Sequence, residues 1–147
     1  MTQVTKDHNG RNRAARERLE AVIARVGARD VVVDDDWTAA GLLAHLAFWD
    51  RLAVARLERH LREGEPPVFA TDAVTDLTNA AGMRQWKDTP PRVAGTQARE
   101  AAAEIDQLIE KLPRDKLDGL KALGRSFLID RSNHRKEHLD QIERALP

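Results

Sequence analysis

Residues 37–51, WTAAGLLAHLAFWDR, decide the fold of this chain, because they form its longest apolar stretch and carry no charge before Asp50. Apolar side chains fall on nearly every side of a helix drawn through this run, which is typical of a helix buried at the centre of a helical protein. The pattern continues beyond the run until Gly64 and the two prolines that follow it, and such residues end helices. We therefore expect one long central helix over residues 38–63.

The remainder of the chain also has helical patterning. Apolar stripes at helical spacing, bounded by glycine and proline, predict further helices at residues 11–26, 72–86, 90–112 and 125–146. Gly119 and Gly124 place a loop before the last of these helices. The three valines at residues 31–33 have the composition of a strand but are too few to build a sheet, so we expect a loop that plugs one end of the core.

The architecture follows from the number of long helices. Four of them, with no convincing strand, predict an all-α fold whose economical form is a four-helix bundle. A length of 147 residues suits a single domain over residues 1–147. The segment at residues 64–89, between the central helix and the next long helix, is too long for a tight hairpin. We therefore expect a crossover connection there, with those two helices parallel.

Composition excludes several classes of function. The chain has no cysteine, which rules out disulfides, thiolate zinc sites and a thiol nucleophile. Lysine plus arginine (24) balance aspartate plus glutamate (24), so no basic excess favours nucleic acid or an anionic membrane as a partner. The longest uncharged run has 13 residues, too few to span a bilayer, and the amino terminus lacks the apolar core of a secretory signal. We expect a cytoplasmic protein with a small-molecule substrate.

Three histidines are candidate metal ligands. His134 and His138 are four residues apart and project from the same, apolar side of the last helix. His45 lies on the inner stripe of the central helix, at a depth that matches His138 if the two helices are antiparallel. Three neutral imidazoles that meet suit zinc, nickel, iron or copper, and they leave an open coordination position for water or substrate.

Ordinary roles for these histidines remain open. A single histidine such as His45 on a buried helix is often a hydrogen-bonded core residue, and pairs such as His134 and His138 also arise by chance. The agreement of the two signals in face and depth is what favours a shared metal. His8 and His60 lie beside charged residues, and we expect both to be solvated.

The residues quoted above resemble the DinB/YfiT-like family. A tryptophan before the central helix, a histidine eight residues later and a His-x-x-x-His near the carboxyl end, here HRKEHLDQIERAL at residues 134–146, are typical of it. The segment from Asp76 to Asn79 is also similar to an Asp-x-x-Asn stretch of the family, and the resemblance covers nearly the whole chain. Gly41 departs from the pattern, because relatives often have an acidic residue in that first helical turn.

The resemblance implies a fold and a function. The fold is a four-helix bundle of up-down-down-up topology, often a homodimer, with a divalent metal on His45, His134 and His138. Some relatives are S-transferases or isomerases that use mycothiol or bacillithiol. For this chain the resemblance implies a metal-dependent enzyme, with zinc or nickel, that transfers or isomerises a substrate with a low-molecular-weight thiol. The alternative is a metal- or ligand-binding bundle of the same family without catalysis.

Other residues near the three histidines have open roles. His134 to His138 spell His-x-x-Glu-His, the motif of inverted zinc proteases, but those enzymes need an acidic ligand far downstream and only nine residues follow here. Glu137 is either a solvated carboxylate or a general base. Asp130 could be a fourth ligand or a hydrogen-bond partner of a ligand. Three aromatic residues belong either to the core or to the wall of a pocket: Trp37, Trp49 and Phe127.

Overall fold

The computed structural model describes residues 7–34 and 37–147, and within them the chain is helical. The elements are α2 (His8–Val26), α3 (Ala39–Glu63), α4 (Asp72–Trp86), α5 (Pro91–Glu110), α6 (Arg114–Ala122), the short 3-10 helix η1 (Ser126–Leu128) and α7 (Ser132–Ala145). A single antiparallel bridge joins Val32 to Thr38, and the described residues form no strand. The prediction of an all-α fold is confirmed. No helix among the described residues is long and apolar enough to cross a membrane.

Local signals set the bounds of the central helix. Thr38 accepts a hydrogen bond from the backbone N–H of Gly41, which caps the first turn of α3. Gly64 ends α3 in a left-handed conformation, with φ at 74°, that residues with a side chain rarely adopt. Gly41 also has a packing role, because a Cβ there would lie 2.9 Å from the sulfur of Met83. The absence of a side chain at this position therefore allows the end of α4 to pack closely on α3.

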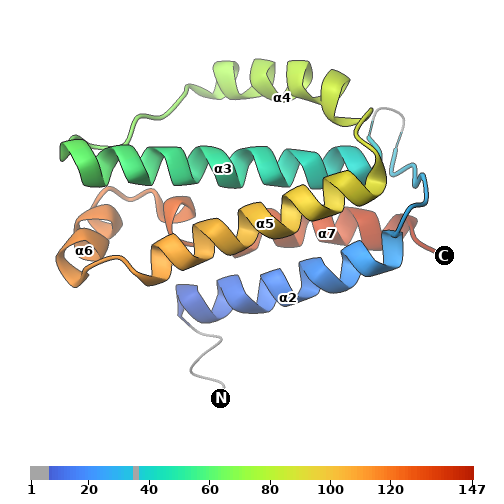
Figure 1. The fold of residues 1–147 in the computed structure, drawn as a ribbon. Helices are drawn as coiled ribbons and strands as arrows, with labels where there is room; N and C mark the ends of the chain where they lie inside the picture. The colour runs from blue at the N-terminus through green and yellow to red at the C-terminus, as the bar shows by residue number, and fades with distance from the viewer. Residues whose placement is uncertain (1–6, 35–36) are drawn as a thin grey trace.

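Four helices, α2, α3, α5 and α7, enclose the core, and α4 lies outside them against α3 (Figure 1). The central helix α3 packs on α5, α4 and α7, while α2 packs on α5 and α7. In Figure 1, α3 and α5 run in one direction and α2 and α7 run in the other. The α4 segment carries the chain back along α3 to the start of α5. This arrangement brings the inner face of α7 to the inner face of α3.

The core consists of two hydrophobic clusters. The first holds the amino-terminal half of α3 against the other long helices, and Val31 and Val33 pack on it, which confirms the predicted plug. The second lies at the opposite end, where α6 and η1 cover the carboxyl-terminal half of α3. Along α3, Asp50 falls between the two clusters and is only 2% exposed. A polar layer therefore crosses the molecule between its two apolar ends.

This polar layer is made of buried ion pairs that fix α7 against its neighbours. Arg135 is 1% exposed and donates to both carboxylate oxygens of Asp106, at 3.0 and 2.8 Å, and to Asp50 at 3.4 Å. Arg131 donates to Asp50 at 2.9 Å. Because Asp50 belongs to α3 and Asp106 to α5, these bonds set the rotation of α7 about its own axis.

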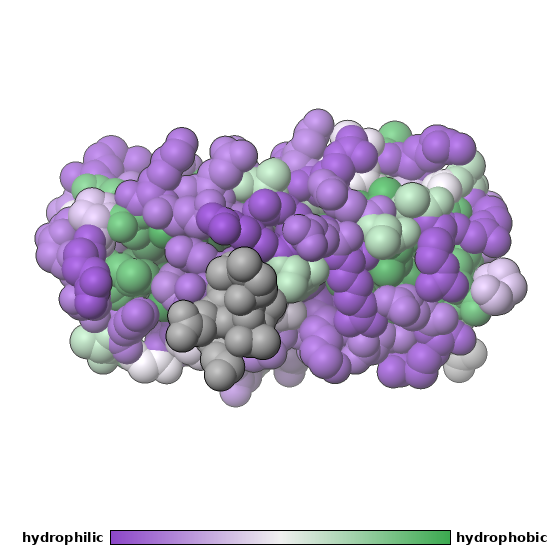
Figure 2. Space-filling model, turned by 90° about the horizontal axis from the view of Figure 1, so that it is seen from below, coloured by the Kyte–Doolittle hydropathy of each residue, from purple (hydrophilic) through white to green (hydrophobic). Residues whose placement is uncertain are grey.

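The face of the molecule on the side of α2 is mostly polar. Figure 2, which shows the molecule from the side of α2, is dominated by hydrophilic residues with scattered apolar ones. Arg13 pairs with Glu110 of α5 at 2.7 Å, and Arg18 pairs with Asp140 and Glu143 of α7 at 2.6 and 2.8 Å. Such exposed pairs contribute little to stability, so the buried layer and the two clusters are the main determinants of the packing.

Two predictions for the carboxyl-terminal third are wrong. Residues 114–122 form a helix rather than a loop, because Leu120 is buried in the second cluster and Gly119 faces open space. The last helix begins at Ser132, not near residue 125, because Asp130 accepts a hydrogen bond from the Ser132 N–H and starts the helix there. Phe127 consequently lies on η1 and is 42% exposed, instead of facing the core from α7.

Candidate metal centre

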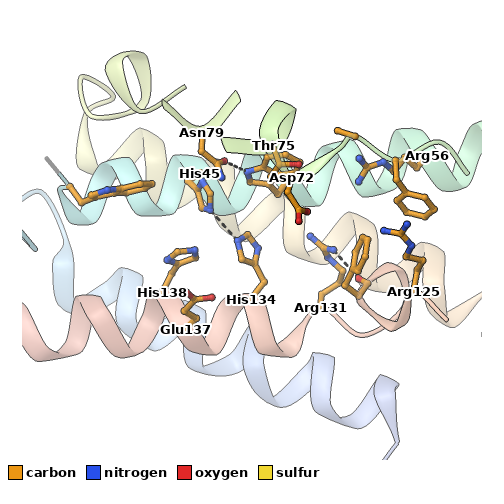
Figure 3. A pocket seen from close by; sticks show the side chains of 15 residues that line it. His45, Arg56, Asp72, Thr75, Asn79, Arg125, Arg131, His134, Glu137 and His138 are labelled. Atoms are coloured by element: carbon orange, nitrogen blue, oxygen red, sulfur yellow. Dashed lines mark hydrogen bonds between the residues drawn. The ribbon is translucent and has the colours of Figure 1, made fainter. Parts of the chain in front are cut away.

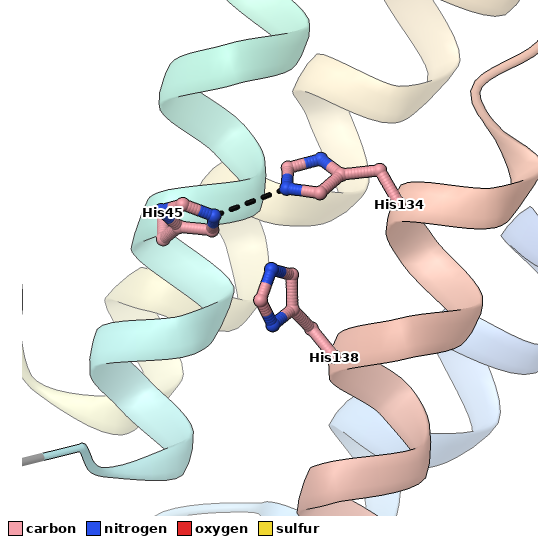
Figure 4. A group of neighbouring side chains, drawn as sticks. All are labelled: His45, His134 and His138. Carbon is pink, nitrogen blue, oxygen red and sulfur yellow. Dashed lines mark hydrogen bonds between the residues drawn. The ribbon is translucent and has the colours of Figure 1, made fainter. Parts of the chain in front are cut away.

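The three predicted histidines meet at one point between α3 and α7 (Figure 4). The Nε2 atoms of His45 and His134 are 3.0 Å apart. The ring centroid of His138 is 4.7 Å from that of His45 and 4.8 Å from that of His134. One nitrogen from each ring lies within 4.8 Å of the other two, and no other group of described residues forms such a cluster of possible ligands.

The local sequence explains how α7 presents two rings to α3. His134 and His138 are four residues apart on α7, about one turn, so both fall on the same face of the helix, the face toward α3. Gln141, nearly a turn further on, fixes one of them, since its Oε1 lies 2.7 Å from the His138 Nδ1. The Nε2 of His138 then points toward the other two rings (Figure 4). An amide oxygen in this position is a suitable support for a metal-bound imidazole.

Burial keeps two rings of the cluster, those of His45 and His134, uncharged. It lowers the pKa of His45 to about 3, with the nearby His138 as a second cause. It lowers the pKa of His134 to about 2, and His138 and His45 add to the effect. Both rings are therefore neutral near pH 7 and carry a free lone pair.

A cation fits this set of donors. One shared proton can satisfy His45 and His134, but three converging lone pairs repel one another unless a positive charge lies between them. The second ring nitrogen of His45, Nδ1, faces away from the cluster and is buried without a hydrogen-bond partner among the described residues. Three imidazole nitrogens are a donor set that zinc, nickel and other transition metals accept.

All three tryptophans of the chain surround His45. The ring centroids of Trp86, Trp37 and Trp49 lie 5.3, 5.6 and 6.4 Å from that of His45. Trp37 also stacks on His138 at 6.4 Å, with an angle of 14° between the ring planes. The absence of a side chain at Gly82 allows the Trp86 ring to take this position, because a Cβ there would lie 2.3 Å from the ring. Aromatic rings thus separate most of the cluster from water.

The cluster opens on one side into a pocket of about 510 Å³ (Figure 3). Trp37, Trp49 and Phe127 all line it, so these aromatics are wall residues rather than core residues alone. Trp49 is held in place by its Nε1, which donates to the Asn79 side chain of α4 at 2.7 Å. The pocket runs from the histidines to Arg56 and other arginines at the opposite end.

The remaining candidate residues have different places. Asp130 is engaged with Arg11, at 2.8 Å, and with Ser132, so it is not one of the clustered ligands. Glu137 is exposed and lines the pocket. The Nδ1 of His60 lies 2.7 Å from the Glu65 carbonyl oxygen, far from the cluster along α3.

The expectation for His8 is wrong. Its side chain is partly buried, and burial lowers its pKa, with the charge of Lys121 as a second cause. The sequence places His8 among charged residues near the amino terminus, but the helix α2 begins at His8 itself and folds it against the carboxyl-terminal third of the chain. The partial burial of His8 therefore depends on a contact between segments that are distant in the sequence.

Several residues of the site were not identified from the sequence. Trp86 reaches His45 through a contact between segments distant in the sequence, whereas Gln141 lies three residues after His138 on the same helix, a spacing that could have identified it. For Arg56 the sequence contains an indication, because this residue lies eleven positions after His45 and so falls on the same face of α3. For Arg125, which lies in the segment between α6 and η1, the sequence contains no such indication.

Comparisons of the chain with family models, with curated proteins and with solved structures found no match. The site consists of three converging imidazoles, a wall of aromatic rings and a pocket that ends in arginines.

Proposed function

We propose that the protein is a metal-dependent enzyme of the DinB/YfiT-like kind, with a divalent ion, zinc or nickel, on His45, His134 and His138. The observation that carries the proposal is the meeting of these three rings at the wall of an open pocket, although 89 residues separate the first two in the sequence. The parallel course of α3 and α5 in Figure 1 supports the family assignment.

The open side of the cluster favours catalysis over simple metal storage. Among the described residues only three possible ligands cluster, and Asp130, the candidate fourth, is bound elsewhere. Three protein ligands with a free position toward a pocket are typical of catalytic zinc sites, whereas structural sites have four. A substrate could therefore reach the ion.

The reaction that we propose joins or rearranges a substrate with the help of a low-molecular-weight thiol. A divalent ion bound to the histidines would supply the Lewis acidity that lowers the pKa of a thiol. The chain has no cysteine, so the sulfur must arrive on a cosubstrate. The tryptophan wall excludes water from the rings, and the exposed carboxylate of Glu137 is available in the pocket to accept the thiol proton. A homodimer belongs to the same proposal.

Metal content tests the first half of the proposal. Mass spectrometry of untagged protein should find about one zinc or nickel per chain. His134→Ala should lose the metal, and His60→Ala, which removes a histidine outside the cluster, should keep it. A parent protein that is empty and also refuses added zinc and nickel would overturn the metal site.

Thiol-dependent turnover tests the second half. The metal-loaded parent should accelerate conjugation of a thiol with an electrophile, and the His134→Ala variant should not. Glu137→Gln should lower the rate while leaving the metal in place. A protein that binds metal fully but turns over no thiol would instead support the non-catalytic binding alternative.

A further inference from the structure

The arginine end of the pocket contains two cations without an anion. Arg56 of α3 and Arg125 both line the pocket and both face the ring of Phe69, with guanidinium carbons 5.3 and 4.6 Å from the ring centroid. Neither forms an ion pair with any described carboxylate. This includes Asp72 and Glu137, the acidic residues that line the same pocket, since neither pairs with Arg56 or Arg125.

Their hydrogen-bonding capacity is also largely unused. Arg56 donates through Nε to the Val68 carbonyl at 2.9 Å, which orients its guanidinium and leaves both terminal amino groups without a partner among the described residues. Arg125 makes no side-chain hydrogen bond to a described residue and is held by the Phe69 ring. Arg131, the third arginine of the pocket, differs from both because Asp50 neutralises it.

No described carboxylate offsets the charges of Arg56 and Arg125 at this end of the pocket. Burial lowers the pKa of Arg56, and the positive charge of Arg131 lowers it further. Two guanidinium groups beside one aromatic ring offer donors that a carboxylate or phosphate accepts in charge-assisted hydrogen bonds. The Phe69 ring contacts both guanidinium groups and restricts their orientation.

We propose that Arg56 and Arg125 form a subsite for a carboxylate or phosphate group of the molecule that reaches the three histidines. This inference rests on the proposed function for what happens at the other end of the pocket. His45 and Arg56 lie about 16 Å apart along the axis of α3. The side chains of the histidines and of the arginines extend into the pocket from its two ends, so the space between them is shorter than this axial distance. The ligand is therefore about as long as an extended tripeptide, roughly 10 Å.

The subsite is tested on metal-free protein, so that it does not depend on the histidines. Inorganic phosphate is titrated in, and the Nε–H resonances of the arginines are followed by NMR. Those of Arg56 and Arg125 should shift and saturate, and Arg56→Gln or Arg125→Gln should weaken phosphate binding about tenfold. Arg62→Gln, on the exposed side of the same helix, is the matched control and should change nothing. Equal, unsaturable shifts at all arginines would overturn the subsite.

A second series identifies which molecule carries the anion. Zinc-loaded protein is titrated with glutathione and with its dimethyl ester, which lacks the carboxylate charges. Tighter binding of the acid, with the difference lost in Arg56→Gln, supports the subsite and assigns the anion to the thiol. Equal binding of acid and ester, with phosphate still saturating the arginines, supports it and assigns the anion to the other substrate. If the protein takes up no zinc, this second series and the proposed function fail, whereas the phosphate titration of metal-free protein still decides the subsite.

Discussion

At the scale of single residues, the histidine cluster should make the metal-free protein sensitive to acid. Burial holds the pKa of His45 at about 3 and that of His134 at about 2, whereas both titrate near 6.5 in an unfolded chain. Below pH 6.5 the unfolded chain therefore binds protons that the folded protein does not. The free energy of unfolding should fall as the pH falls, by up to about 1.4 kcal/mol per pH unit for each histidine.

Urea unfolding of metal-free protein between pH 7.5 and pH 5 measures this dependence. The double variant His45→Gln, His134→Gln should have a shallower slope over that range, while His60→Gln should keep the parental slope. The comparison uses slopes and not absolute stabilities, since the glutamines also change packing. Identical slopes in the parent and the double variant would contradict burial of the neutral rings.

Gln141 is predicted to tune metal affinity without being a ligand. Its side chain lies 2.7 Å from the His138 Nδ1 and so fixes which nitrogen faces the other two rings. Gln141→Leu should weaken zinc binding about 10- to 100-fold, the usual cost of losing a partner of a metal-bound histidine. Competition with a chromophoric chelator measures the affinity. Gln141→Glu restores an acceptor and should recover most of it, whereas a purely steric role would not distinguish leucine from glutamate.

At the scale of elements, the buried ion pairs position α7. Arg135 donates to Asp106 of α5 and to Asp50 of α3, and it is almost fully buried. Arg135→Met should lower the free energy of unfolding by about 3–5 kcal/mol, because it leaves two carboxylates buried with fewer partners. Chemical denaturation measures the loss. The control is Lys136→Met on the same helix, whose pair with Asp140 is exposed, and its effect should stay below about 1 kcal/mol.

The buried layer also links stability to the site. Arg131 lies just before α7, and Arg135 lies on the same helix as His134 and His138, so a rotation of α7 would move both rings away from His45. A variant that loosens this layer should therefore bind metal more weakly even though it changes no ligand. The polar layer, which lies between the two apolar clusters, thus holds α7 at one rotation about its own axis.

At the scale of the whole molecule, α4 is the least anchored of the longer helices. It packs on α3 from outside the four long helices, and Met83 is its one buried residue among those described. Its backbone amides should exchange with deuterium at least about tenfold faster than those of α3. Hydrogen exchange with peptide-level mass spectrometry measures both in one sample. Exchange in α4 as slow as in the core of α3 would contradict this picture.

Ligand binding should slow that exchange, because two residues of α4 form part of the site. Asn79 holds Trp49 at the pocket, and Trp86 covers His45. An occupant of the pocket that packs on these tryptophans should order α4 as well.

The sequence by itself determined the helical class and the identity of the candidate ligands. The apolar run at residues 37–51 predicts a buried central helix, and the spacing of His134 and His138 places them on one face, because both signals depend only on local periodicity. The inward position of His45 on α3 follows from the same periodicity. These features need no knowledge of which helix packs on which.

The tertiary structure alone decided the rest. The place of Phe127 on the pocket wall, the position of Trp86 beside His45 and the approach of Arg125 to Phe69 all depend on contacts between distant segments. The helix at residues 114–122 also forms because Leu120 finds an apolar cluster to cover. Contacts between segments distant in the chain stabilise some local choices over others, and a local pattern carries no information about those partners.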